Sequence, residues 1–192
     1  GTSSAERVQK CLSEAQVVLV REPENPYASD VAAGCNAFAA DGAQSRGEDP
    51  EPLLRKSLTL LEPAVRQYPH FLWGINDLAS VYVTLGAYLQ IHGKPGSRDL
   101  FDKAIGYENM AVALDGGYLV ALQNLMFTYA KVISQIGSIQ ELNSVLGGVD
   151  RVYANCVEKN KQFPQCHINY VVDYSRAAAR AQEAGSDPQP ML

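Results

Sequence analysis

The chain has 192 residues, of which 46% are hydrophobic and 19% are charged, a composition that supplies a folded core and argues against a disordered tail. The 16 lysines and arginines against 21 aspartates and glutamates give a net charge of −5, and since no basic stripe stands out, we expect no nucleic acid partner. No apolar run approaches the roughly 18 residues of a membrane span, and the N-terminus does not resemble a signal peptide. We expect no membrane contact by this chain, and its start at Gly1-Thr2 indicates a fragment of a longer protein.

The sequence repeats itself at intervals of about 46 residues. Four glycines that end predicted helices lie 46, 44 and 48 residues apart: Gly47, Gly93, Gly137 and Gly185. The predicted helices that precede the last three of these glycines contain Tyr82, Tyr129 and Tyr174, at intervals of 47 and 45 residues. Such a period is typical of stacked supersecondary elements rather than of one convergent core. The sequence predicts one repeat domain over 1–192, with repeats at about 1–47, 48–93, 94–137 and 138–185 and a stub at 186–192.

Each repeat is predicted to contain two helices, because apolar residues recur at three- and four-residue spacing on both sides of a break. In chain order, the helices are expected over Ala5 to Arg21, Tyr27 to Ser45, Leu53 to Val65, Ile75 to Leu89, Asp102 to Leu114, Tyr118 to Ile136, Ile139 to Gln162 and Cys166 to Ala184. The breaks contain Pro23, Pro69, Gly116-Gly117 and Pro164. No stretch sustains a two-residue alternation, so the sequence predicts an all-α fold.

The pattern inside the repeats resembles the tetratricopeptide repeat. That family places a leucine, a small residue and a tyrosine on its first helix, small residues on its second, and Asp-Pro at the stop. Leu78–Tyr82 and Leu125–Tyr129 are similar to the first helix. Asp102–Ile105, followed by Ala111 and Leu114–Gly116, is similar to the second, with glycine where the family prefers proline. The resemblance implies helical hairpins stacked in a right-handed superhelix, with small side chains where helices approach closely.

Two features depart from the family pattern. The repeats exceed the usual length of about 34 residues by roughly a dozen, and Asn36 and Tyr170 replace the expected tyrosine and leucine. Such elongated repeats, with openings like Gly47–Leu54 and the phrase Phe71–Ala79, resemble the arrays that follow the catalytic domain of bacterial serine/threonine protein kinases, notably of myxobacteria. The sequence contains no glycine-rich phosphate loop, His-Arg-Asp loop or Asp-Phe-Gly, so the ATP chemistry of a kinase parent would lie outside it.

The four cysteines form two symmetric pairs about predicted breaks. Cys11 and Cys35 lie twelve residues either side of Pro23, and Cys156 and Cys166 lie five either side of Lys161. Residues equidistant from the turn of an antiparallel hairpin share one height, so each pair could form a disulfide. The alternative is that the cysteines occupy small-residue positions of the repeat. Disulfides would indicate an extracytoplasmic, periplasmic-side location, and free thiols the bacterial cytoplasm.

We expect neither a metal nor another cofactor. Cys156, Cys166 and His167 give at most three ligands at a spacing unlike any zinc motif, and His70 and His92 are isolated. A Cys166-His167 nucleophilic pair is unfavourable, because sequence neighbours on a helix point to different sides. No nucleophile, base and orienting group assemble from the sequence, so we expect a protein that is not an enzyme.

In the family that the chain resembles, the helices with the leucine and tyrosine line the concave face, and their outward side chains contact ligands. The groove residues expected on this basis are Tyr27, Asp30, Trp73, Asn76, Ser80, Gln123, Phe127, Lys131, Asn169 and Arg176, with Tyr27, Trp73 and Phe127 as apolar anchors. An alternative assigns Asn76, Asn124 and Asn169 to backbone bonds between helices. Another places Trp73 in the core. The mixed groove composition argues against a highly acidic peptide tail as ligand.

These features favour a non-catalytic module that binds a protein or peptide, in the regulatory or sensor region of a bacterial serine/threonine kinase. One alternative is a periplasmic helper protein that binds a small molecule or lipid in a pocket between helices. A closed apolar tunnel or lipid retained through purification would favour it. A second alternative is a structural or oligomerisation spacer. A stable dimer formed through the last repeat would support it.

Overall fold

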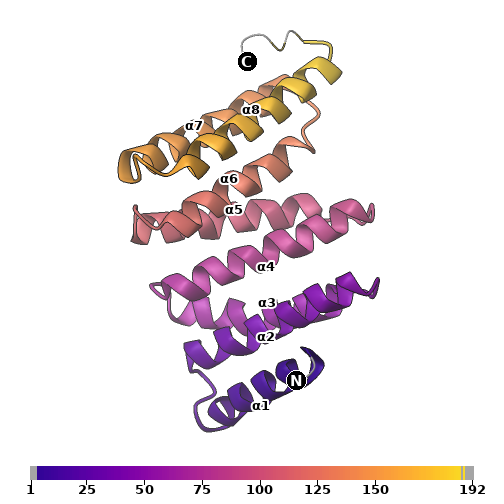
Figure 1. Ribbon diagram of the computed structural model, residues 1–192, viewed down its shortest axis with the longest axis vertical. Helices are drawn as coiled ribbons and strands as arrows, with labels where there is room; N and C mark the ends of the chain where they lie inside the picture. The colour runs from indigo at the N-terminus through magenta and orange to yellow at the C-terminus, as the bar shows by residue number, and fades with distance from the viewer. Residues whose placement is uncertain (1–3, 187, 189–192) are drawn as a thin grey trace. The chain divides into compact units, whose positions relative to one another are not determined.

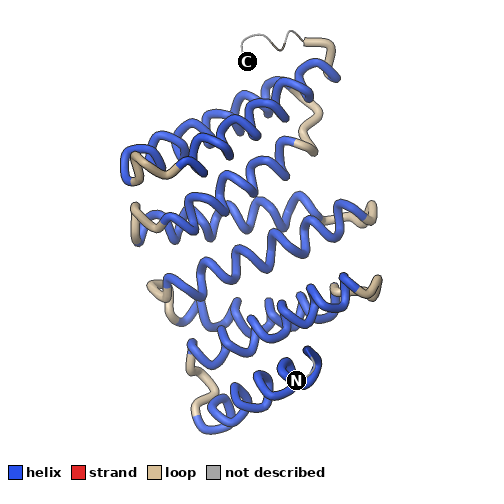
Figure 2. The backbone as a smooth tube through the Cα atoms, in the orientation of Figure 1, coloured by secondary structure: helices blue, strands red, loops and turns tan. Residues whose placement is uncertain are grey.

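The structure, a computed structural model that describes residues 4–186 and 188, is built from helices (Figures 1 and 2). In this described part, eight helices follow one another: α1 (Ser4–Arg21), α2 (Pro26–Ser45), α3 (Glu51–Gln67), α4 (Leu72–Ile91), α5 (Ser97–Leu114), α6 (Leu119–Ile133), α7 (Ile139–Lys159) and α8 (Pro164–Glu183). The same residues form no strand. The predicted all-α fold of helical hairpins is therefore confirmed.

The chain divides into two compact units, an N-terminal unit (Gly1–Leu100) and a C-terminal unit (Phe101–Leu192). The N-terminal unit contains α1 to α4 and the first turn of α5, and the C-terminal unit contains the rest of α5 with α6 to α8. Within the N-terminal unit, the α1–α2 and α3–α4 turns lie at one end of the helices and the α2–α3 connection at the other (Figure 1). The α5–α6 and α7–α8 turns likewise share one end of the C-terminal unit.

Four turns of one kind join the helices into hairpins. Each is closed by a backbone hydrogen bond from the residue that precedes the second helix to a carbonyl three residues earlier: Asn25 to Glu22, Phe71 to Tyr68, Tyr118 to Asp115 and Phe163 to Asn160, at 2.9 to 3.0 Å. The turns begin 46, 47 and 45 residues apart along the chain. Proline stands in the first turn of α2 and α8, where its missing N–H has no partner to lose.

Three of the second helices, α2, α4 and α8, end in a glycine cap of the same kind. Gly47, Gly93 and Gly185 have φ values of 76°, 63° and 73°, a left-handed conformation that glycine adopts without a steric penalty. In each case the next residue donates a 2.8 or 2.9 Å bond back to the helix, as Lys94 does to the carbonyl of Leu89, and the arrangement is a Schellman motif. The prediction that Gly137 ends a helix is wrong. α6 ends earlier, at Ile133, where the hydroxyl of the next residue bonds the carbonyl of Lys131 at 2.6 Å.

In the N-terminal unit, α2 contacts α1 and α3, and α3 contacts α4. α2 contributes small buried side chains such as Ala32 and Ala33, whereas α3 contributes the large Leu54 and Leu61. Small side chains on one helix let two backbones approach. The buried Ser57 Oγ of α3 accordingly donates a 2.8 Å hydrogen bond to the backbone carbonyl of Ala33.

The leucine and tyrosine of the repeat pattern are buried in both units. Leu78 and Tyr82 lie in the core of the N-terminal unit, where the tyrosine hydroxyl donates to Glu62. Leu125 and Tyr129 are buried in the C-terminal unit. There, a Cβ on Gly148 would lie 2.6 Å from the hydroxyl oxygen of Tyr129. Only glycine lets α7 approach α6 this closely.

A carboxyl group lies in the core of the C-terminal unit. Glu108 of α5 is fully buried, and burial raises its pKa to about 8. The Thr128 hydroxyl lies 3.0 Å from a carboxyl oxygen of Glu108 and 2.8 Å from the carbonyl of Asn124. Since a hydroxyl has one proton, both contacts are satisfied when a protonated Glu108 donates to Thr128 and Thr128 donates to Asn124.

The helices match their predicted ranges within a few residues. The largest difference is at α5, which begins at Ser97 rather than Asp102. α4 begins three residues early, and α6 and α7 each end three residues early. In the described ranges, no helix combines the length and apolarity that a membrane crossing needs.

Candidate functional site

All ten predicted contact residues lie on the second helix of a hairpin, that is on α2, α4, α6 or α8. α2 lies against α4 in the N-terminal unit, and α6 lies against α8 in the C-terminal unit. We call their outward sides the second-helix faces; they carry Tyr27 and Trp73 in the N-terminal unit and Phe127 and Arg176 in the C-terminal unit.

Two aromatic side chains project from the second-helix face of the N-terminal unit. Tyr27 of α2 is 58% exposed and Trp73 of α4 is 61% exposed, so the alternative that placed Trp73 in the core is wrong. The Tyr27 ring meets Phe71 edge to face at a centroid distance of 4.8 Å and meets Trp73 in the same way at 6.4 Å. Contact with Phe71 supports Tyr27 while leaving more than half of its surface in water.

These rings line a groove of about 810 Å³ formed by residues 25–27 and 67–73, which we call the aromatic groove. The first segment begins α2 and the second contains the α3–α4 turn and the start of α4. Because both hairpin turns lie at the same end of this unit (Figure 1), segments more than 40 residues apart in sequence form one wall. Sequence reasoning identified Tyr27 and Trp73 and missed Tyr68 and Phe71.

Carboxyl groups lie beside the aromatic groove and on the helices that adjoin it. The lining residue Asn25 donates a 2.7 Å hydrogen bond to Glu22, and Gln67 donates a 2.8 Å bond to Glu24. On the adjoining helices, Asp30 of α2 faces Asp77 of α4, and burial together with the nearby Asp77 carboxylate raises the pKa of Asp30 to about 7. Two carboxylates are therefore bonded to residues that line the groove, and two more carboxyl groups lie on the helices that adjoin it.

Two other predicted contacts of the N-terminal unit bond within their own helix. Asn76 is buried and donates to the Asp77 carboxylate at 3.2 Å. The Ser80 hydroxyl donates to the Asn76 carbonyl at 3.0 Å. Their side chains thus support α4, whereas the exposed surface comes from the aromatic residues.

An apolar stripe on α2 escaped the sequence analysis. Val31 and Phe38 are 52% and 54% exposed, and with Tyr27 they follow the four- and seven-residue spacing of one helix face. Beside them is a second, apolar cavity of about 390 Å³ between α1 and α2, lined by Arg7, Val8, Cys11, Val31, Gly34, Cys35 and Phe38. The spacing was visible in the sequence, but such a stripe ordinarily indicates a buried face.

The second-helix face of the C-terminal unit combines an aromatic ring with cations. Phe127 of α6 is exposed, and the Lys131 ammonium lies 4.9 Å from its ring centroid. Burial, with the nearby positive Arg176 of α8, lowers the pKa of Lys131. These three predicted contact residues therefore lie together, and the surface is cationic.

The remaining predicted contacts of this unit are partly engaged. Asn169 accepts a 2.8 Å hydrogen bond from the Gln165 amide, and Gln123 is half-buried. Beneath them, Asp173 is buried on α8, and burial raises its pKa to about 7 although Arg176 opposes this shift.

A tyrosine cluster, also missed in sequence, joins α7 to α8. Tyr153 stacks on Tyr170 at 4.0 Å, and its hydroxyl lies 2.9 Å from the Nδ1 of His167. Tyr170 and Tyr174 both donate to Asp150, at 3.1 and 2.7 Å. His167 is thus engaged with a tyrosine, and within residues 4–186 and 188 no three histidine, cysteine or acidic residues are placed to hold a metal ion.

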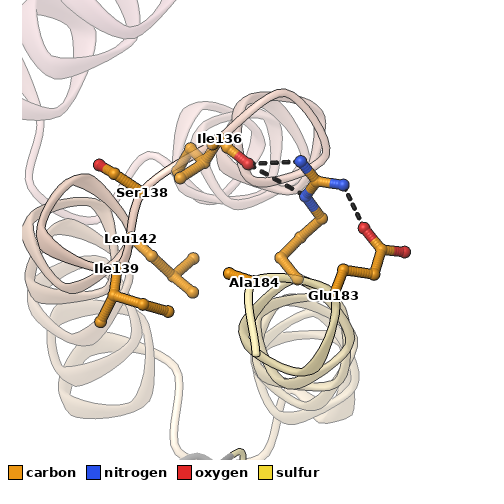
Figure 3. A pocket seen from close by; sticks show the side chains of 8 residues that line it. Ile136, Ser138, Ile139, Leu142, Glu183 and Ala184 are labelled. Carbon is orange, nitrogen blue, oxygen red and sulfur yellow. Dashed lines mark hydrogen bonds and ion pairs between the residues drawn. The ribbon is translucent and has the colours of Figure 1, made fainter. Parts of the chain in front are cut away.

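A smaller cavity of about 270 Å³ lies between the α6–α7 connection and the end of α8 (Figure 3). Arg180 fills one side, where its guanidinium donates to the Ile136 carbonyl at 3.1 and 2.5 Å and pairs with Glu183. Because its charged group is already used to fix the connection to α8, we regard this cavity as structural.

The cysteines meet as the symmetry about the turns predicts. Cys11 of α1 and Cys35 of α2 are placed at disulfide distance with Cα atoms 6.1 Å apart, and Cys156 of α7 and Cys166 of α8 with Cα atoms 6.0 Å apart. Both separations fall in the range of protein disulfides. Each pair joins the two helices of one hairpin.

Comparison with known proteins supports the fold. No model of a protein family matches the sequence, and no curated protein matches it. Among solved structures, the chain is similar to a thermophilic tetratricopeptide repeat protein of Thermus thermophilus, with a TM-score of 0.54 and 16% identity over 94% of this chain and 82% of that one. At this identity the likeness concerns the fold alone. The chain is therefore an all-α repeat protein with a tetratricopeptide-like fold.

Proposed function

We propose that the chain is a non-catalytic module that binds a peptide or protein segment on its second-helix faces. The exposure of the large side chains of Tyr27, Trp73 and Phe127 carries this proposal. Exposed aromatic side chains bordered by polar groups are common anchors of protein interfaces. Hairpins that pack against one another hold such a surface in place before a partner arrives, so the partner does not have to order it.

Selection of a random peptide library on the intact chain tests this proposal. Enriched peptides are titrated by calorimetry against W73A, F127A and the control I91A, whose side chain is exposed on α4 outside the aromatic groove. We expect one of the first two variants to weaken binding by about tenfold or more, as loss of an interface anchor does, and the control to change it less than about twofold. Failure to enrich any peptide, or equal affinity for all three variants, would contradict the proposal.

The style of the repeats extends the proposal to the regulatory or sensor region of a bacterial serine/threonine protein kinase. The elongated repeats and the opening Gly47–Leu54 support it through their resemblance to kinase-associated arrays. The residues that precede Gly1 in the parent gene test it. A kinase domain followed by a membrane-spanning helix agrees with the proposal, and a chain without a kinase domain contradicts it.

We further propose that the two cysteine pairs are oxidised and that the chain works in an extracytoplasmic compartment. Their placement at disulfide distance supports oxidation, and structural disulfides persist mainly in oxidising compartments. Intact mass after alkylation without reductant measures this. An unmodified chain is expected, and four alkylated thiols would instead agree with the cytoplasm.

The size of the aromatic groove favours a small molecule or lipid as a second candidate ligand. Its volume of about 810 Å³ lies within the range of roughly 300 to 1,000 Å³ common for small-molecule sites. Native mass spectrometry of the purified chain tests this candidate. A bound mass that disappears in Y27A would support it, and a spectrum of the bare chain would count against it.

A further inference from the structure

We infer that the aromatic groove of the N-terminal unit receives a basic segment, with an arginine side chain lying over the exposed faces of Trp73 and Tyr27. This inference rests on the peptide-binding function proposed above and names the chemistry of its partner. A guanidinium group stacks on aromatic faces and also bonds carboxylates, and the groove offers both kinds of group.

The charge of the surrounding sequence is complementary to such a partner. Residues 22–45, which contain α2 and the turn before it, include four acidic residues and no lysine or arginine. Residues 67–93, which contain the α3–α4 turn and α4, include Asp77 and again no lysine or arginine. The basic residues that flank these two ranges, Arg21, Arg46, Arg66 and Lys94, do not line the groove. A basic segment would therefore meet attraction at this surface, and an acidic one would meet repulsion.

The C-terminal unit shows the interaction that the groove lacks. There, the ammonium of Lys131, one helical turn further along α6, lies 4.9 Å from the centroid of the Phe127 ring. One turn after Trp73 the chain instead has Asp77, and one turn after Tyr27 it has Val31. In the N-terminal unit, the residue one turn after each exposed ring is thus a carboxylate or an aliphatic side chain rather than a cation. An incoming arginine would supply the cation.

The carboxylates are positioned to bond the inserted group. Glu22 and Glu24 are held beside the groove by hydrogen bonds from the lining residues Asn25 and Gln67. A guanidinium over the rings would find these oxygens at the edge of the groove, and charge-assisted hydrogen bonds of this type are stronger than neutral ones. A neutral proline-rich segment could also stack on the rings, but it would leave the carboxylates unused.

Trp73 is the only tryptophan of the chain, so its fluorescence reports on this groove. The intact chain is titrated with three blocked hexapeptides, alternating glycine with arginine, glutamine or glutamate. Fluorescence measures binding at the groove, and calorimetry measures binding anywhere on the chain. The same titrations are run on Y27A, on E24Q and on the control I91A, whose exposed side chain lies on α4 outside the aromatic groove.

We expect the arginine peptide alone to bind with a saturable change in Trp73 fluorescence. Y27A should weaken this binding about fivefold, the size of one cation–π contact, E24Q should weaken it and reduce its salt dependence, and I91A should leave it unchanged. Arginine binding that is equal in Y27A and wild type would be diffuse attraction to a protein of charge −5 and would overturn the inference. Binding of the glutamine or glutamate peptide with an equal change in Trp73 fluorescence would overturn it too, because the groove would then not select a basic partner, while the proposed peptide-binding function would stay intact. If none of the three peptides binds, the basic partner is rejected, and the library selection decides the proposed function separately.

Discussion

The two units present corresponding helix faces that differ in charge. The position thirteen residues after the helix N-cap is Phe38 and Thr84 in the N-terminal unit and Lys131 and Arg176 in the C-terminal unit. The first face is aromatic and bordered by carboxylates, and the second is aromatic and cationic. A repeat needs its buried positions to hold the hairpins together, whereas its outward positions vary at little cost to folding. Binding chemistry therefore differs between units that share one architecture.

Loss of the proposed disulfides, one in each unit, should change stability the most. Alanine in place of both cysteines of a pair should lower the free energy of unfolding by about 3.5 kcal/mol for Cys11–Cys35 and about 2.8 kcal/mol for Cys156–Cys166, because the longer loop loses more freedom when it is closed. The separations are 24 and 10 residues. Urea unfolding followed by circular dichroism measures both. If neither double variant is less stable than the oxidised wild type, the cysteines are not cross-linked.

Buried carboxyls should make the C-terminal unit more sensitive to pH. Glu108 stays protonated in the folded state up to about pH 8 but ionises near its ordinary value of 4.5 when unfolded. Between these values unfolding releases a proton, so stability falls as pH rises, by at most about 1.4 kcal/mol per pH unit for one such group. We expect E108Q to flatten this slope in urea titrations from pH 5 to 8, and D30N, at a less buried site, to flatten it less. An unchanged slope in E108Q would show that Glu108 does not hold the proton.

Substitution by alanine should have opposite effects on stability at two glycines of the C-terminal unit, because only one of them lies where two helices approach closely. G148A should lower stability by about 2 kcal/mol, because overpacking against a buried ring is costly and the added Cβ would lie 2.6 Å from the Tyr129 hydroxyl. G106A meets nothing within 4 Å inside α5 and should raise stability by up to about 1 kcal/mol through helix propensity. Thermal unfolding of both variants measures the difference. Equal effects would mean that α6 and α7 do not pack in this way.

Substitution by alanine should also affect stability differently at a glycine that ends a helix and at one that lies in a loop. G93A should cost about 1 kcal/mol, because alanine is strained at a φ of 63°. G137A should change stability by less than about 0.5 kcal/mol, as for most surface substitutions, since this glycine lies beyond the end of α6 and a Cβ added there would meet nothing within 4 Å. Chemical denaturation of the pair measures the contrast. A penalty of similar size at Gly137 would restore the sequence prediction that it ends a helix.

Local chemistry made most of the fold predictable. Apolar spacing, prolines at helix starts and the glycines at 47, 93 and 185 gave helix positions to within a few residues. Gly137 was assigned to the same role because glycine in a loop and glycine in a cap look alike in sequence. The cysteine pairing followed from symmetry about the turns, since a hairpin places equidistant residues at one height.

The candidate site was only partly predictable. The repeat resemblance selected the second helices and pointed to Tyr27, Trp73 and Phe127, which are indeed exposed. It could not show that Asn76 is buried, or that Tyr68 and Phe71 line the same groove as Tyr27, because these depend on how one hairpin lies against the next. Val31 and Phe38 were missed for a related reason. Their spacing predicts a helix face, but burial of that face depends on its neighbours in space.

The location of a bound peptide shows whether the second-helix faces are the binding surface. Amide hydrogen exchange of the intact chain, measured with and without a library-selected peptide, maps the protected segments. We expect protection on the second helices, with α2, α4 and the α3–α4 turn protected by a basic peptide, and with residues 51–66 of α3 and all of α7 unchanged. Protection confined to α3 or α7 would show that the partner binds the opposite side of the hairpins and would contradict the account.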